Sequence, residues 1–270
     1  MSKHLEKFPK TFTEFVGLVD KIQLSCQNSI WYRGCGDSSY KLIPSLYRHK
    51  SIKDSVDFAA FEHSLMIRFI QRSVPFCDKS ITEGWDSFFF MQHYGVPTRL
   101  LDWTENPFIA FYFAVMSAKY KVTKKGIKFT SPASVWILDP VAWNRYALKH
   151  ESYDKGVLST PDEQLKGYKP AETASKINNL PVALNGIHNS SRIVAQRGVF
   201  TIFGRDKSSM EKIFERDKFP KNSLIKVTFK EEFLYDMKQS ILNHGITESV
   251  VFPDLDGLAR EIKREFKFKD

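Results

Sequence analysis

The sequence has little cysteine and no long hydrophobic run. Its 270 residues include three cysteines, Cys26, Cys35 and Cys77, with no CxxC pair and no zinc-site spacing. So few cysteines exclude a disulfide framework and favour a reducing, cytoplasmic location. The longest apolar run, from Pro107 to Ala118, is shorter than the ~20 residues of a membrane-spanning helix, and the N-terminus lacks the apolar region of a secretion signal. We expect a soluble, unexported protein with no membrane partner.

Several common enzyme motifs are also absent. The glycines form neither a GxGxxG nor a Walker motif, and neither HExxH nor GxSxG occurs in the chain. These absences argue against dinucleotide-binding Rossmann folds, P-loop enzymes and the common zinc and serine hydrolases. A two-metal nuclease would need a carboxylate cluster, which the sequence does not offer. We predict no metal site.

Charge is the first feature that is present in excess. The chain has 40 Lys and Arg against 31 Asp and Glu, a formal charge of +9, while 42% hydrophobic residues are ordinary for a folded protein. The surplus indicates either solubility alone or a polyanionic partner. Basic segments at 119–128, 205–221 and 260–269 could contact nucleic-acid phosphates.

The pattern of apolar residues predicts an α+β fold, helix-rich in its N-terminal half, rather than a βαβ array. Helices are predicted near 11–27, 54–72, 85–92, 107–115, 140–146, 231–243 and 255–266. Strands are predicted over 29–33, 98–103, 134–138, 199–203, 224–229 and 245–252. We expect residues 1–28 to hold a docking helix and residues 29–268 to form one domain, with a polar surface insertion around 150–180.

Polar residues stand out where they interrupt aromatic, core-like segments. Arg33 follows Trp31 and Tyr32 on a predicted strand, and a half-buried guanidinium must find an anion, either a phosphate ligand or a structural carboxylate. Glu248 falls within the predicted strand 245–252, where it is costly unless it is paired, faces a cleft or is solvated at an edge.

A second polar group surrounds the predicted strand 98–103. His93, Tyr94, Arg99, Asp102 and Thr104 crowd this short segment. His93 is either catalytic or a satisfied structural histidine. Asp102 or Thr104 could instead cap the helix that follows, because both side chains accept hydrogen bonds from the first turn of a helix.

These segments together resemble the FRG-domain family, which is named after a Phe-Arg-Gly motif. The resemblance rests on Tyr32-Arg33-Gly34, on QHYGxPTRLLDWTxNP from Gln92, on AxxFA from Ala110, on QxGxFT from Gln196 and on GITESVVFPDLDGLAR from Gly245. Tyr32 stands where the family has phenylalanine. The resemblance extends over roughly residues 25 to 265, so it implies that 29–268 form an FRG domain.

The order of these residues is also similar to ADP-ribosyltransferases of the Arg, Ser-Thr-Ser, Glu type and to DarT-like toxins. This similarity implies a split central β-sheet flanked by helices, with NAD as substrate. It implies the catalytic residues Glu248, Arg33 and His93, with Asp102-Trp103-Thr104 in place of Ser-Thr-Ser. The implied NAD-binding residues are Tyr32, Arg33, Gly34, Tyr94, Arg99, Asp102, Trp103, Thr104 and Gln196.

The resemblance therefore implies a transferase that moves ADP-ribose from NAD to a macromolecule. The basic balance favours a nucleic-acid acceptor, RNA more than DNA, and Ile246, two residues before Glu248, disfavours a protein arginine. Such an activity implies a toxin with an antitoxin partner, or a role in phage defence. The alternative is a non-catalytic module that binds nucleic acid or another ligand, in which Arg33, His93 and Gln196 form one polar network.

Overall fold

The computed structural model of the chain describes residues 4–26, 28–54, 58–77, 81–124, 126–170, 177–187 and 191–268. Part of the predicted insertion, residues 171–176, and positions 125 and 269 of the basic segments lie outside the described residues. Within the described ranges no helix has the length and apolar character needed to cross a bilayer.

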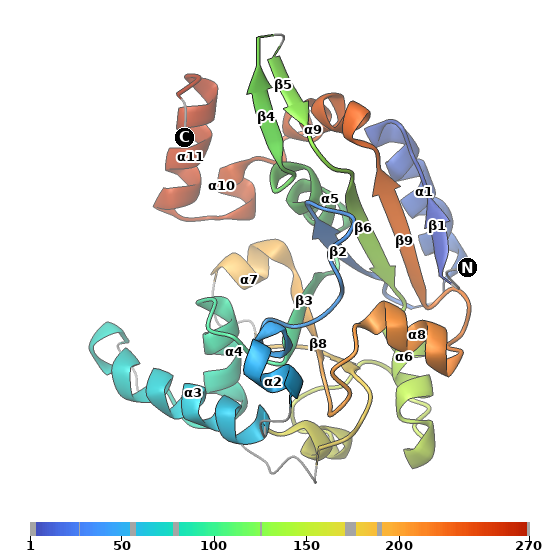
Figure 1. The fold of residues 1–270 in the computed structure, drawn as a ribbon, viewed down its shortest axis with the longest axis vertical. Helices are drawn as coiled ribbons and strands as arrows, with labels where there is room; N and C mark the ends of the chain where they lie inside the picture. Colours follow the sequence, from blue (N-terminus) through green and yellow to red (C-terminus); the bar gives the residue numbers. More distant parts are fainter. Residues whose placement is uncertain are drawn as a thin grey trace.

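A seven-stranded sheet forms the centre of the fold (Figure 1). Its spatial order is β1 (Leu5–Lys7), β9 (Leu224–Phe229), β6 (Ala133–Leu138), β2 (Trp31–Cys35), β3 (Leu100–Thr104), β8 (Gly198–Ile202) and β7 (Val182–Leu184). Every pair of neighbours is antiparallel except β1 and β9. A separate hairpin joins β4 (Tyr120–Thr123) to β5 (Gly126–Phe129). This largely antiparallel sheet confirms the α+β prediction.

The sheet is nearly divided between β2 and β3. Strand β2 pairs with β6 over five residues and β3 pairs with β8 over five, but β2 and β3 share the single pair Tyr32 and Thr104. Beyond that pair the two strands no longer follow one another. The backbone of Arg33 and Gly34 therefore parts from that of Asp102, and an opening remains between two well-paired halves of the sheet.

Helices complete the fold on both faces of the sheet (Figure 1). The α-helices are α1 (Phe12–Ser25), α2 (Lys50–Asp54), α3 (Phe58–Ser73), α4 (Trp85–His93), α5 (Pro107–Met116), α6 (Pro140–Ala147), α7 (Ser191–Gln196), α8 (Met210–Asp217), α9 (Leu234–Asn243), α10 (Glu248–Val251) and α11 (Leu255–Glu265). Short 3-10 turns are η1 (Leu46–Arg48), η2 (Val74–Phe76), η3 (Lys149–Glu151), η4 (Glu163–Tyr168) and η6 (Glu231–Phe233).

Two hydrophobic clusters hold these layers together. One contains side chains of α1, α5 and α9 packed on β6 and β9, with Phe15, Phe111 and Phe229 in mutual ring contact. The other joins β2, β3, β7, β8 and parts of β6 and β9 to α3, α4, α6 and α8, and it includes Trp31 and Trp143. Since side chains alternate along a strand, neighbouring residues of β2 enter different clusters: Trp31 one and Tyr32 the other.

Several helix starts follow from their capping residues. Thr11 accepts a hydrogen bond from Glu14 N at 3.1 Å, and Asp254 accepts one from Gly257 N at 2.7 Å. Thr104, however, does not cap α5. Asn106 Oδ1 accepts from Phe108 N at 2.9 Å, and Pro107 follows as the first helical residue. Asn106 takes the cap because Thr104 still belongs to β3.

One predicted segment was wrong in form, and another contains buried residues. Residues 245–252 were predicted as a strand, but 248–251 form helix α10, since Phe252 N bonds to Glu248 O across one helical turn. The segment around 150–180 was predicted as a surface insertion, yet Leu158, Leu165 and Tyr168 are completely or almost completely buried. Despite the polar composition of the segment, these three side chains belong to the hydrophobic core, and Leu158 forms a β-bridge with Leu184 of β7.

Candidate functional site

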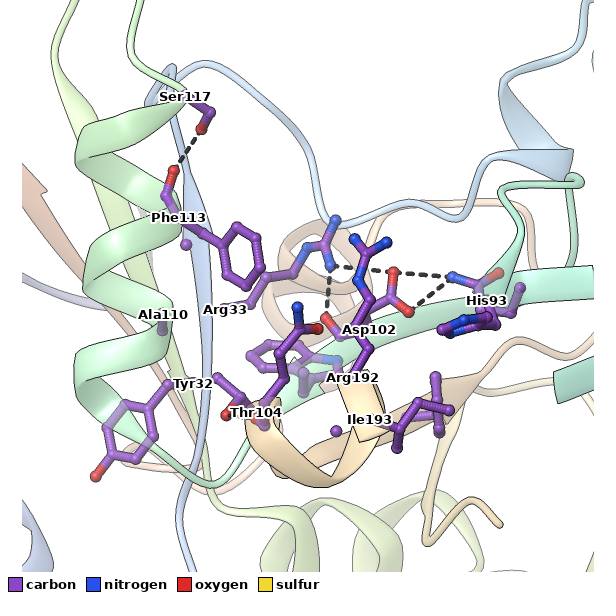
Figure 2. Close-up of a pocket in the computed structure, with 16 residues that line it drawn as sticks. Tyr32, Arg33, His93, Asp102, Thr104, Ala110, Phe113, Ser117, Arg192 and Ile193 are labelled. Carbon is purple, nitrogen blue, oxygen red and sulfur yellow. Dashed lines mark hydrogen bonds and ion pairs between the residues drawn. The ribbon is translucent and has the colours of Figure 1, made fainter. Parts of the chain in front are cut away.

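A pocket of about 310 Å³ lies where β2 and β3 part. Its walls come from β2, β3, β8, α4, α5 and α7, which are distant in sequence (Figure 2). Eight of the residues proposed from the sequence line it: Tyr32, Arg33, Gly34, His93, Asp102, Trp103, Thr104 and Gln196. Three do not: Tyr94, Arg99 and Glu248. The fold therefore gathers most of the predicted site from separate segments.

Arg33 and Asp102 form the polar centre of the pocket. Arg33 Nη1 donates to the main-chain oxygen of Asp102 at 2.5 Å and lies 3.8 Å from its carboxylate Oδ2. The Asp102 side chain is 56% exposed and that of Arg33 is 26% exposed. The pair is thus anchored through the backbone while both charged groups remain accessible from the cavity.

Gln92 holds the Asp102 carboxylate in place. Its Nε2 donates to both carboxylate oxygens, at 2.9 and 2.8 Å. The buried Thr98 hydroxyl donates to Gln92 Oε1 at 2.5 Å, which fixes the orientation of the amide. A chain of hydrogen bonds therefore leads from the core through Gln92 to Asp102 and orients the carboxylate toward Arg33.

Gly34 has a steric role at this site. A Cβ atom added there would lie 1.9 Å from Ala110 O and 2.7 Å from Ala114 N of α5. Only glycine allows the strand to lie this close to the helix backbone, so Gly34 sets the depth of the pocket wall beside Arg33.

Two further groups that can carry positive charge face the same space. His93 and Arg192 are half-buried, and Figure 2 shows Arg33, Asp102 and Arg192 directed toward one another. Burial lowers the pKa of His93, and the positive charge of Arg192 lowers it further. At neutral pH the site thus holds two guanidinium groups, one carboxylate and a neutral imidazole.

Other predicted residues line the pocket but are engaged in holding it together. Thr104 Oγ1 donates to Gln196 O at 2.5 Å and accepts from Asn106 N at 3.0 Å. Gln196 Nε2 donates to Val251 O at 3.0 Å, and Trp103 Nε1 donates to Thr201 Oγ1 at 3.1 Å. These bonds link β3, α7, α10 and β8. The elements that form the pocket wall are therefore held together by side-chain hydrogen bonds.

Tyr32 lines the pocket with its backbone rather than with its ring. Its side chain points away from Arg33 in Figure 2, is fully buried, and its hydroxyl accepts from Gln23 Nε2 at 3.1 Å. Burial raises the pKa of this hydroxyl to about 12, so it stays protonated. The alternation of side chains along β2 explains why Tyr32 and Arg33 face opposite sides.

Arg99 lies outside the pocket, in the core. It is fully buried and makes two bonds to Glu62, Nε to Oε1 at 2.8 Å and Nη2 to Oε2 at 2.9 Å. It also donates to Phe203 O at 2.8 Å and to Tyr168 O at 3.1 Å. The expected phosphate contact is therefore replaced by an internal ion pair. Sequence inspection missed it because Glu62 lies on a distant helix.

Glu248 and Tyr94 lie elsewhere as well. Glu248 is 5% exposed, and both its carboxylate oxygens accept from Arg264 Nε at 2.9 Å, so the carboxylate binds α11 instead of facing the pocket. Its placement in a helix rather than a strand redirects the side chain. Tyr94 is 65% exposed and borders a different, apolar hollow with Phe69 and Phe76.

The pocket also contains residues that the sequence did not single out. Gln92 precedes His93 in the QHYG motif, and this neighbouring position was the sequence feature that could have indicated Gln92 as a site residue. Phe113 was the aromatic residue of the AxxFA motif, whereas Arg192 lines the pocket without belonging to any of the motifs. Among the described residues, no group of three or more His, Cys, Asp or Glu side chains is placed to hold a metal ion.

Comparison with known proteins identifies one family. Residues 28–122 match the family described as FRG domain, a segment that holds Arg33, His93 and Asp102 but ends before Gln196 and Glu248. No curated protein and no solved structure matches the chain. The matched segment supplies β2, α4, β3 and α5, and with them the polar centre of the pocket. By this match residues 28–122 of the chain contain an FRG domain.

Proposed function

We propose that the protein is an NAD-dependent ADP-ribosyltransferase whose NAD site is the pocket between β2 and β3, with nucleic acid as acceptor. The observation that carries the proposal is the union of Arg33, Arg192 and the oriented Asp102 carboxylate in one cavity. As the resemblance to DarT-like toxins implies, such an enzyme would act as a toxin restrained by an antitoxin protein or used in phage defence.

The two guanidinium groups suit the pyrophosphate of NAD. A guanidinium presents a planar set of donors that matches phosphate oxygens, and charge-assisted hydrogen bonds are worth about 1.5–3 kcal/mol each. Arg33 is already held at its Asp102 anchor, so little side-chain freedom is lost when a ligand binds. The apolar ring of Phe113 and the wall near Phe200 offer surface for the nicotinamide.

Asp102 is the carboxylate that we place at the reaction centre, in contrast to the role that resemblance implied for Glu248. When the bond between ribose C1′ and the nicotinamide nitrogen breaks, its electron pair leaves with nicotinamide and the ribose becomes oxocarbenium-like. A carboxylate beside C1′ stabilises that positive charge. The acceptor then forms a bond to C1′ and loses its proton, which the neutral imidazole of His93 can accept.

The test separates binding from transfer. Isothermal titration calorimetry measures NAD affinity, and labelled NAD incubated with total RNA, DNA and protein measures transfer. Arg33→Gln should weaken NAD binding about 10- to 100-fold, the loss of one charge-assisted contact. Asp102→Asn should keep NAD affinity and lower transfer about 10²- to 10⁴-fold. Lys10→Gln is the matched control, because Lys10 is exposed and is not among the described residues that line the pocket.

Two outcomes would redirect the proposal. If the folded protein, freed of any inhibitor, binds NAD but releases no nicotinamide and labels nothing, the non-catalytic binding module is the better description. If NAD does not bind at all and Arg33→Gln changes nothing, the pocket is not a dinucleotide site and the proposal fails.

A further inference from the structure

A second, strongly basic groove adjoins the pocket on the other side of Arg33. Its volume is about 910 Å³, and it shares Arg33, Gly34 and Ser117 with the pocket. Residues of the loop that follows β2 line one side, and residues at the start of α8 line the other. We call it the basic groove, after its five basic lining residues, Arg33, Lys41, Arg48, Lys207 and Lys212.

In the part of the chain that the structure describes, no acidic side chain lines the basic groove. The carboxylates next to this lining are already engaged. Asp102 lies 3.8 Å from Arg33, and Asp37 accepts from Ser39 N at 2.9 Å. Glu211 accepts from Leu42 N at 3.2 Å, and Asp206 accepts from Ser208 N at 2.8 Å and pairs with Arg216 at 2.7 Å. The charged side chains on the lining itself are therefore all positive, which favours the binding of a polyanion.

The start of α8 supplies an independent sign of a missing ligand. Ser209 precedes the helix and lines the groove, but its side chain makes no capping bond. The residue is 2% exposed, and its hydroxyl is buried with no hydrogen-bond partner among the described residues. A buried hydroxyl left unpaired is costly, and a helix N-terminus attracts anions. A phosphate oxygen in the groove would accept a hydrogen bond from the Ser209 hydroxyl and would place a negative charge at the N-terminus of α8.

We propose that the basic groove binds the phosphodiester backbone of a single-stranded nucleic acid and leads one nucleotide past Arg33 into the pocket. Its role as acceptor site rests on the proposed transferase function; the binding does not. Apart from Arg33, which we assign to the pyrophosphate of NAD, four lining cations remain for other phosphates. Tyr40, 48% exposed, offers a ring on which a base can stack. A base in a duplex could not reach the pocket unless it left the stack.

Fluorescence anisotropy with labelled 12-nucleotide RNA and DNA strands, without NAD, tests the groove directly. The variant Lys41→Gln/Arg48→Gln/Lys212→Gln removes three exposed charges. Each lost phosphate contact should reduce the slope of log affinity against log salt by about 0.7, so the slope should fall by about 2 and affinity about 100-fold at 0.1 M salt.

The matched control removes three exposed lysines from the hairpin and from α11, Lys121→Gln/Lys128→Gln/Lys263→Gln, and should leave the affinity and slope close to those of the unaltered protein. Ser209→Ala should weaken strand binding about tenfold without lowering the melting temperature, because it removes an unpaired hydroxyl and no internal bond. A merely structural serine would give the opposite pair of results.

The outcomes separate this proposal from the proposed function. If the slope of log affinity against log salt is unchanged in the groove variant, the proposal that the groove binds nucleic acid is overturned, even if the protein transfers ADP-ribose. Loss of strand binding together with intact NAD affinity supports it, even if no transfer occurs. Equal affinity for a duplex, or loss of NAD affinity in the groove variant, overturns it, because the groove would then hold a duplex or the dinucleotide.

Discussion

Replacing Arg99 by methionine should cost stability rather than ligand binding. The guanidinium is completely buried and makes four hydrogen bonds, two of them to the equally buried Glu62. Arg99→Met leaves this carboxylate without its counter-ion and two carbonyl oxygens without donors. Removing one partner of a buried pair typically costs about 3–5 kcal/mol, a large part of the roughly 5–15 kcal/mol that stabilises a protein.

Thermal unfolding followed by circular dichroism measures this cost. For a chain of this length each kcal/mol corresponds to about 2 °C, so the melting temperature should fall by about 6–10 °C. Glu62→Leu should cause a similar fall. The double variant should lose far less than the two single variants together, because no charge is then left unpaired, and the coupling energy should reach about 2–4 kcal/mol.

The reasoning would be refuted by one clear pattern. If Arg99→Met melts at the temperature of the unaltered protein but loses NAD affinity, Arg99 serves the ligand, as the sequence first indicated, and the buried ion pair is of no consequence. Additive effects in the double variant would likewise contradict the claim that Arg99 and Glu62 act as a pair.

Three further predictions concern the site and its supports. Gly34→Ala should lower the free energy of unfolding, measured by urea titration, by about 1–3 kcal/mol, because the added Cβ would meet Ala110 O at 1.9 Å. The control Gly17→Ala, whose Cβ would have no atom within 4 Å, should leave that free energy unchanged or raise it. Glu248→Gln should lower stability by about 1.5–3 kcal/mol yet preserve NAD affinity and transfer; lost transfer with retained stability would restore its catalytic role. Because the pKa of His93 is lowered in the folded protein, the unfolded chain binds more protons below about pH 6.5. Acidification should therefore destabilise the unaltered protein more than the His93→Asn variant. Urea midpoints of the two proteins that change in parallel from about pH 5 to 8 would contradict this.

The sequence was informative wherever a signal is local. Capping side chains such as Thr11 and Asp254 act within one helical turn, so they could be recognised from neighbouring residues. The six-residue strand Leu224–Phe229 was predicted with its observed bounds because its apolar and β-branched residues are continuous. Residues 245–252 misled because a short apolar run fits a strand and a buried helical turn equally well.

The candidate site was predicted in part for the same reason. Arg33, His93 and Asp102 were recognisable as polar residues in aromatic segments, and all three line the pocket. Whether a given arginine faces a cavity or a buried carboxylate depends on a partner far away in sequence. Arg33 and Arg99 looked alike in the sequence, and only the distant Glu62 distinguishes them.

By itself the sequence determined the α+β class, most of the helices and strands, and a set of charged residues too costly to bury without partners. The tertiary structure decided which of those residues meet. The β2 and β3 strands share one residue pair and then part, which opens the pocket and sets the basic groove beside it. The pocket and the groove depend on contacts between residues that are far apart in the chain. The geometry of these contacts is set by packing, so no local sequence pattern predicts it.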